Sequence, residues 1–154
     1  MTVNIVPIAP TSVRIVWPLV EHHIEAALEY CQGTYLPIDI LEQVERGEKQ
    51  LWVAQRQDGH VVAALVSFIN RYPRRTSVCV PFIGGTEVRT WFRKALLAIE
   101  SWGFENGCDA LEGGARRGWL RLARMQEAGV YLWKDLDRVS IDSTAREMIE
   151  EEAA

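Results

Sequence analysis

Apolar positions near the N-terminus come in short runs that prolines separate. A first strand is expected over residues 3–6 or over residues 13–16. One long element is excluded, because proline fixes its own φ angle and lacks the N–H group that a regular element would use. The prolines that interrupt this region are Pro7, Pro10 and Pro18.

Two helices are predicted next, from apolar residues spaced three and four positions apart. The first covers residues 19–31 and the second covers residues 37–46. Gly33 and Gly47 follow them, and glycine commonly ends a helix because it tolerates the left-handed conformation there.

Three antiparallel strands are predicted over residues 51–83. The first two, residues 51–56 and 61–69, flank the dipeptide Asp58-Gly59, which is a strong hairpin signal. The second strand is almost continuously apolar, as is typical of a strand covered on both faces. The third strand covers residues 76–83.

Two units of strand, glycine pair and helix dominate the second half of the chain. They are residues 76–83, Gly84-Gly85 and 86–105, and then residues 110–112, Gly113-Gly114 and 117–128. Because strand–helix–strand connections are right-handed, the two strands are expected to be parallel neighbours that splay apart near Gly84 and Gly113. Residues 130–136 are expected to close the sheet as a last strand.

The predicted fold is therefore α/β (α+β): a mixed, largely antiparallel twisted sheet flanked by helices, with an extra C-terminal helical tail. One domain is expected over residues 1–139 and an acidic helical tail over residues 140–154. Thr144 and Glu147 have the spacing of a capping box. The tail ends in Glu150-Glu151-Glu152, at the negative end of its own helix dipole, so that alone it is expected to fray.

Composition and charge narrow the classes of function. The formal net charge of −4 and the pI near 5.4 argue against general nucleic-acid binding, which normally uses a basic face. The three cysteines and three histidines show no metal-ligand spacing, so no metal and no disulfide framework are expected. No apolar run is long enough to cross a membrane, and the N-terminus lacks the basic region of a signal peptide, so a cytoplasmic location is expected.

Three stretches of the sequence carry a resemblance to a known family. Residues 80–85 read Val-Pro-Phe-Ile-Gly-Gly, residues 107–119 read Gly-Cys-Asp-Ala-Leu-Glu-Gly-Gly-Ala-Arg-Arg-Gly-Trp, and residues 127–130 read Glu-Ala-Gly-Val. With the order of predicted elements, they make the chain resemble the GNAT acyltransferase superfamily. More narrowly, the chain resembles small GNAT-like proteins encoded by bacteriophages and prophages. The resemblance implies a GNAT-like fold and an acetyl-CoA-dependent N-acyltransferase activity.

The resemblance also implies a place for acetyl-CoA. The cofactor would lie in the opening of the sheet between residues 80–83 and 111–113, with its phosphates on the N–H groups at the start of a helix. The alternative is a tight strand–helix turn that binds no cofactor. The candidate cofactor-binding residues are Val80, Phe82, Gly84, Gly85, Thr86 and Arg117.

Several positions depart from the GNAT pattern, which is Arg/Gln-x-x-Gly-x-Gly/Ala in the cofactor loop. Pro81 and Thr86 stand at its first and last positions, and Glu87 adds a negative charge where phosphates would bind. Met125 stands where GNAT enzymes often carry a tyrosine that protonates the departing thiolate, and methionine has no proton to give. Acetyl-CoA binding is therefore expected to be weak or absent, and the general acid is not identified.

Glu112 is the candidate general base, because it ends a short strand beside a glycine pair. A partly buried carboxylate there is expected to have a raised pKa. The alternative, which the missing acid favours, is a structural role as an anchor for Arg116 or Arg117.

Arginines form a stripe on the second of the two helices. Arg117, Arg121 and Arg124 have the spacing of one helix face. The stripe is interpreted as an anion site for cofactor phosphates or for an acidic protein surface, including the chain's own residues 140–154. The alternative is a solvated face paired with nearby acids.

Two functions remain open on this evidence. One is an N-acyltransferase. The other is a non-catalytic component of a phage particle or of its assembly, which would use the fold as an interaction module. Its contacts would be the arginine stripe and the tail, made with phage structural proteins or with a second copy, and it would be associated with the virion.

Overall fold

One five-stranded sheet, in the order β1-β2-β3-β4-β5, organises the molecule. The computed structural model describes residues 2–114 and 119–154. Neighbouring strands from β1 to β4 are antiparallel, and β5 is parallel to β4. The predicted mixed, largely antiparallel sheet is confirmed, as is the parallel pairing of its last two strands. The strands are β1 (Val3–Ile8), β2 (Gln50–Arg56), β3 (Val61–Arg71), β4 (Thr76–Gly85) and β5 (Ala110–Glu112).

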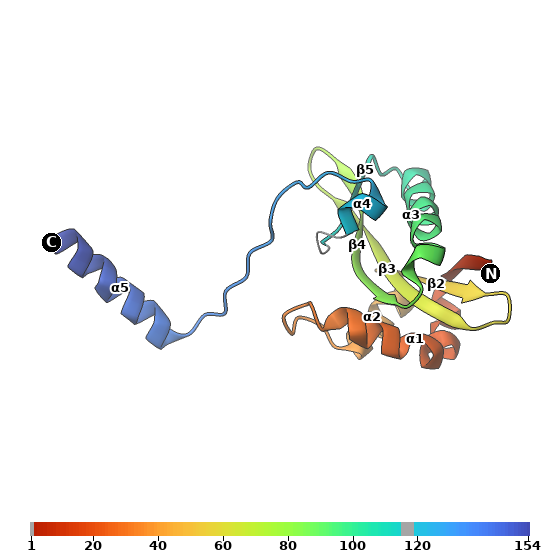
Figure 1. Ribbon diagram of the computed structural model, residues 1–154, viewed down its shortest axis with the longest axis horizontal. Coiled ribbons are helices and arrows are strands. Elements are labelled where there is room, and N and C mark those ends of the chain that lie inside the picture. The colour runs from red at the N-terminus through yellow and green to blue at the C-terminus, as the bar shows by residue number, and fades with distance from the viewer. Residues whose placement is uncertain (1, 115–118) are drawn as a thin grey trace.

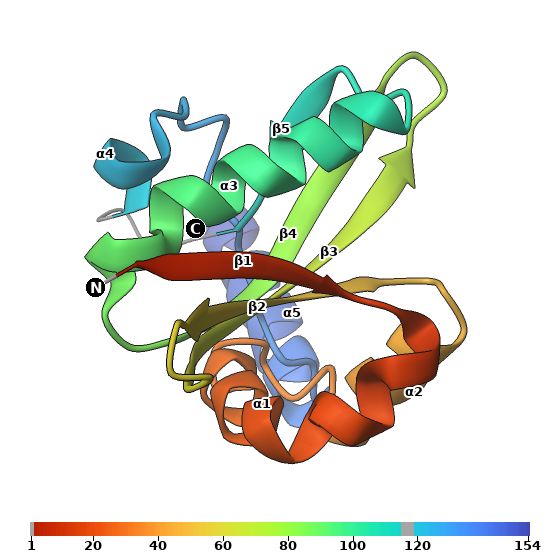
Figure 2. The same cartoon turned by 90° about the vertical axis from the view of Figure 1, so that its right-hand side faces the viewer.

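Helices cover both faces of this sheet. A single 3-10 turn, η1 (Pro10–Ser12), leads into α1 (Val13–Leu28), and α1 and α2 (Pro37–Glu45) lie on one face. The long helix α3 (Val88–Glu105) lies on the other face (Figure 2). Each face has its own apolar core, and β3 contributes to both because its residues 61–67 are buried throughout. Burial on both faces of the sheet explains why β3 is apolar along most of its length.

The first helix starts earlier than its spacing predicts. Residues 13–16 belong to α1 and not to a strand, and Pro18 lies inside the helix. Proline removes one helical hydrogen bond. Burial of Val13, Trp17 and Val20 against the sheet outweighs that loss, because these residues share one face of the helix.

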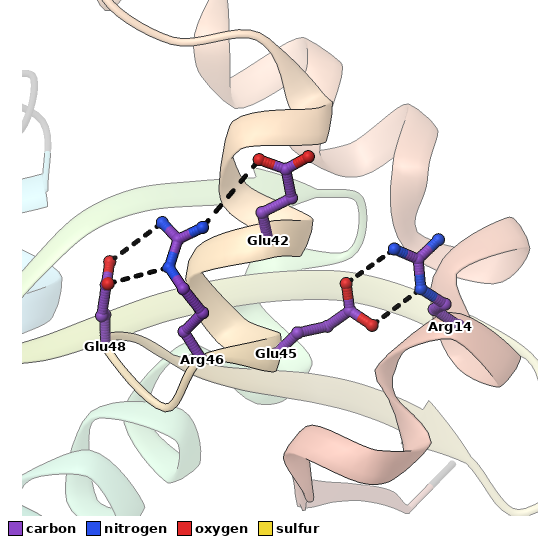
Figure 3. Close-up of polar contacts among 5 residues, drawn as sticks. All are labelled: Arg14, Glu42, Glu45, Arg46 and Glu48. Carbon is purple, nitrogen blue, oxygen red and sulfur yellow. Dashed lines mark hydrogen bonds and ion pairs between the residues drawn. The ribbon is translucent and has the colours of Figure 1, made fainter.

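Exposed ion pairs link α2 to α1 and to the residues that follow it (Figure 3). Arg14 of α1 donates to Glu45 of α2 at 2.7 and 2.8 Å. Arg46 pairs with Glu48 at 2.8 Å and lies 4.0 Å from Glu42. Such exposed pairs each contribute about 1 kcal/mol or less, so that the buried faces of α1 and α2 supply most of the stability here.

The C-terminal third differs most from the expectation. Helix α4 (Trp119–Ala123) ends well before residue 128, and the sheet ends at β5. The prediction of a last strand over residues 130–136 is wrong in this structure, since that segment is extended but pairs with no described strand. Helix α5 (Arg138–Ala153) follows it and lies apart from the folded body (Figure 1). No residue of α5 is buried.

Candidate functional site

The candidate site lies where β4 and β5 part. The two strands pair over three positions only, from Ser77 opposite Ala110 to Cys79 opposite Glu112. Strand β4 then continues to Gly85 while β5 ends, so the sheet opens beyond Cys79. Facing residues of parallel neighbours lie on the same side of the sheet, and Glu112 and Cys79 therefore share one face.

Three side chains donate hydrogen bonds to the Glu112 carboxylate. The Ser77 hydroxyl is 2.7 Å from one oxygen, and the Tyr72 hydroxyl is 2.9 Å from both. The Asn70 amide is 3.5 Å away and also donates to the Tyr72 oxygen at 2.9 Å. The donors come from β3, from the turn after it and from β4, so three successive segments of the chain converge on one carboxylate.

These contacts decide the charge state of Glu112. Partial burial raises its pKa, but the hydrogen bonds from Ser77, Tyr72 and Asn70 outweigh burial, and the pKa is lowered overall. The expectation of a raised pKa was wrong because it counted burial and missed the donors. The alternative partners, Arg116 and Arg117, lie outside the described residues.

Two further groups lie on the same face. Burial and the neighbouring Glu112 raise the pKa of the Cys79 thiol to about 12, so this thiol stays protonated at neutral pH. The Lys49 ammonium lies over the ring of Phe68, 4.4 Å from its centroid, and burial lowers the Lys49 pKa. Neither Cys79 nor Lys49 therefore behaves as an ordinary surface group.

A small apolar pocket adjoins Glu112, on the α3 side of the opening. Its volume is about 40 Å³, which is far below the ~300–1,000 Å³ of typical small-molecule sites. The candidate cofactor residue Val80 lines it, whereas Phe82 packs in the core under α1. Met125, at the position of the expected tyrosine, is part of the wall. The lining residues are Val80, Ile83, Phe92, Leu96, Leu111, Glu112, Gly113, Ala123 and Met125.

A larger pocket of about 180 Å³ lies beside the end of β4, between the C-terminal end of α1 and Trp91 of α3. It is lined partly by polar groups, among them Glu29 and Tyr30 at the C-terminal end of α1. Ile83 lines both pockets, so an apolar pocket and a more polar one adjoin at the end of β4.

The glycine pair of the predicted cofactor loop has a packing role. A Cβ atom on Gly84 would lie 2.0 Å from the carbonyl oxygen of His23, and one on Gly85 would lie 2.4 Å from the Ala63 side chain. The N–H group of Thr86 is already bonded to the Val62 carbonyl at 2.9 Å. Close approach of α1 and β3 therefore explains both glycines without a ligand.

The start of α3 keeps features that suit an anion. The helix begins at Val88, and its N-cap residue Glu87 makes no side-chain cap. The Glu87 carboxylate instead forms an ion pair with Arg56 of β2. The expected competition between Glu87 and a phosphate for the same N–H groups is thus reduced.

Only part of the predicted arginine stripe lies within the residues that the structure describes. Arg121 lies on α4, whereas Arg124 follows the end of that helix with a φ angle of 52°. Both are exposed, and Arg117 lies outside the described residues. Among residues 2–114 and 119–154, no three metal-ligating side chains come together, and no helix is long and apolar enough to cross a membrane.

No protein-family model matches the chain, and no curated protein matches it in sequence. Its structure does match solved acetyltransferases. One is an aminoglycoside acetyltransferase from an uncultured soil metagenomic sample, solved in complex with sisomicin, with a TM-score of 0.66 at 15% identity; the match covers 88% of this chain and 97% of that one. Another is the glucosamine-6-phosphate N-acetyltransferase of Arabidopsis thaliana, with a TM-score of 0.63 at 10% identity and coverage of 89% and 100%.

The chain has the GNAT fold. At these identities the likeness concerns the arrangement of elements and not the activity. The sequence predicted only part of the polar cluster around Glu112. It indicated Glu112 itself but not the donors Asn70, Tyr72 and Ser77. The available signal was the parallel register, which places Ser77 and Cys79 on the face of Glu112.

Proposed function

We propose that the chain is an acetyl-CoA-dependent N-acyltransferase with weak cofactor binding and low catalytic power. The observation that carries the proposal is the Glu112 carboxylate, which three hydroxyl and amide groups hold at the opening between β4 and β5. Its lowered pKa keeps it ionised at neutral pH, so that it can accept a proton, but it also makes Glu112 a weak base, in keeping with low catalytic power.

The described residues fit the cofactor in part. Its phosphates would meet the first turn of α3, which has no side-chain cap, and its acyl end would approach the apolar pocket through Val80 and Leu111. The pocket of about 40 Å³ is too small to hold more than the acyl end of the cofactor. The N–H group of Thr86 is already bonded to the Val62 carbonyl and offers no donor to a phosphate. Weak binding is the physical expectation.

Glu112 has one role in the proposed reaction. Acetyl-CoA would supply the acyl group as a thioester. The Glu112 carboxylate would take the proton that an attacking amine must lose, while Ser77 and Tyr72 fix its orientation. Met125 leaves the departing thiolate without a proton donor at that position, which limits the rate.

Calorimetry with acetyl-CoA, and a thiol-release assay with a panel of primary amines, test this proposal. Glu112→Gln is expected to lower turnover ~100-fold or more while leaving cofactor affinity within ~2-fold. Glu100→Gln, at an exposed position of α3, is the matched control. No thiol release with any amine, or equal turnover in Glu112→Gln, would overturn the proposal.

The second candidate function is a non-catalytic interaction module, of the kind that the phage resemblance implies. Two observations favour it: Met125 at the place of the general acid, and a C-terminal helix that lies apart from the body. A chain that releases no thiol from acetyl-CoA but binds a phage structural protein would support this candidate over the enzyme.

A further inference from the structure

A row of three side chains crosses β3, β4 and β5 on the side of the sheet that carries α1 and α2. Phe68 is opposite Cys79 in the register of β3 and β4, and Cys79 is opposite Glu112 in the register of β4 and β5. Side chains alternate along a strand, and the chain neighbours Val78 and Leu111 pack under α3, so the row faces the other side. All three residues of the row are only half-buried, and a small molecule can therefore contact them.

The Lys49 ammonium lies at the Phe68 end of this row. It is 4.4 Å from the centroid of the Phe68 ring and 5.7 Å from that of the Tyr35 ring. Lys49 is half-buried, and no carboxylate among the residues that the structure describes forms an ion pair with it. The adjacent Glu48 is paired with Arg46 at 2.8 Å. Because a charge that is partly shielded from water gains from a partner of opposite sign, this position favours an anion.

Opposite charges thus mark the two ends of the row, with the Lys49 ammonium over Phe68 and the carboxylate of Glu112 two strands away. Neighbouring strands are ~4.8 Å apart, so Phe68 and Glu112 are separated by about 10 Å. A direct hydrogen bond takes up ~3 Å at each end. A ligand whose amine and anion are separated by a few bonds would therefore contact both charges. The Cys79 thiol, which lies between them, is protonated at neutral pH and adds no charge of its own.

We propose that the acyl acceptor is a short amino acid, whose amine contacts Glu112 and whose carboxylate contacts Lys49. The proposal rests on the acyltransferase proposed above and names its substrate class. The amine nitrogen bonds to the acyl carbon as the carbon–sulfur bond of acetyl-CoA breaks, a proton of the amine passes to Glu112, and the thiolate leaves. The carboxylate does not react, and Lys49 is a specificity residue. A plain amine would leave Lys49 without a partner, and a diamine would place a second cation beside it.

Binding of β-alanine and of propylamine gives the first test, because the two probes have the same chain length and differ in the carboxylate. NMR shifts of the backbone amides of Phe68, Cys79 and Glu112 report binding without cofactor or turnover. Wild type should bind β-alanine ~10-fold or more tightly than propylamine, as a charge-assisted hydrogen bond provides. Lys49→Met keeps the apolar stem and should remove this preference. Lys134→Met removes the same charge at an exposed position outside the sheet and should keep the preference.

Charge reversal provides a result that misfolding cannot produce. Lys49→Glu should bind diaminopropane more tightly than β-alanine, which is the opposite of the wild-type order. Equal binding of β-alanine and propylamine to wild type would overturn the inference. So would a preference for β-alanine that survives in Lys49→Met or in Lys49→Glu.

Thiol release from acetyl-CoA separates this inference from the proposed function. In wild type, kcat/KM for β-alanine should exceed that for propylamine ~10-fold or more, and Lys49→Met should remove the difference. Thiol release that is equally fast with both amines would overturn the inference and leave the acyltransferase standing. No thiol release with any amine would overturn the acyltransferase, whereas a binding preference for β-alanine that depends on Lys49 would still support the site.

Discussion

The Tyr72 hydroxyl donates to the Glu112 carboxylate from a position 2.9 Å from each of its oxygens, across 40 residues of sequence. Ser77 donates to the same group at 2.7 Å. The glutamate is therefore held as an ion by neutral donors. The pKa of Tyr72 is raised by the same contact, because its ionised form would face the carboxylate.

The first prediction concerns stability against pH. Because the Glu112 pKa is lowered from 4.5 in the folded protein, its ionised form stabilises the fold. That contribution should be fully present above the unfolded value and lost as the pH falls through the lower folded value. Urea unfolding of the wild type and of Glu112→Gln should therefore differ most above pH ~4.5 and converge in acid. A difference that is constant with pH would contradict the hydrogen-bonded ion, and Glu100→Gln should show no such convergence.

The second prediction concerns Gly84. An alanine Cβ there would lie 2.0 Å from the His23 carbonyl oxygen, and neither backbone can yield easily. Gly84→Ala should destabilise the protein by about 1–3 kcal/mol, as overpacking does. Gly114→Ala is the control, because its Cβ would meet nothing within 4 Å, and it should change stability by at most ~0.5 kcal/mol. Thermal and urea unfolding measure both, and equal effects would refute the packing role.

The third prediction concerns the ion pair between Arg56 and Glu87 at the start of α3. If phosphates bind there, Glu87→Gln should tighten acetyl-CoA binding ~2- to 5-fold, since one negative charge near the helix N-terminus is removed. Arg56→Gln should weaken binding by a similar factor, because it leaves Glu87 uncompensated. In the double variant, the effect of Arg56→Gln should shrink. Calorimetry at low salt would measure these changes in acetyl-CoA affinity. Unchanged affinity in all three variants would show that the phosphates do not bind at the start of α3.

The fourth prediction concerns α5. We propose that Glu150, Glu151 and Glu152 contact a basic surface, with Arg121 and Arg124 of a second copy as the candidates. Each exposed pair is worth about 1 kcal/mol or less, so association should weaken with added salt. Reversing the three tail acids to lysine should weaken association at low salt without unfolding the chain.

Reversing three exposed acids of α1 and its C-cap instead provides a matched control for that change in net charge. These are Glu21, Glu25 and Glu29. If the two sets of variants associate equally at low and high salt, α5 makes no ionic contact.

The sequence by itself determined most of the fold, because local patterns report local structure. The Asp58-Gly59 hairpin, the apolar run of β3 and the first strand–helix unit appear where spacing predicts them, whereas the helix of the second unit is much shorter than predicted. The parallel pairing of β4 and β5 followed from the handedness of the connection through α3. Each of these inferences needed only neighbouring residues and a general rule.

Only the tertiary structure decided what surrounds Glu112, because its donors lie 35, 40 and 42 residues away in the sequence. The same holds for Gly84, whose constraint is a carbonyl oxygen of α1, and for residues 130–136, whose apolar pattern predicts a strand but not its neighbour. A periodic pattern specifies which side of a segment must be covered. What covers it depends on contacts between distant segments, and those are set when the whole chain folds.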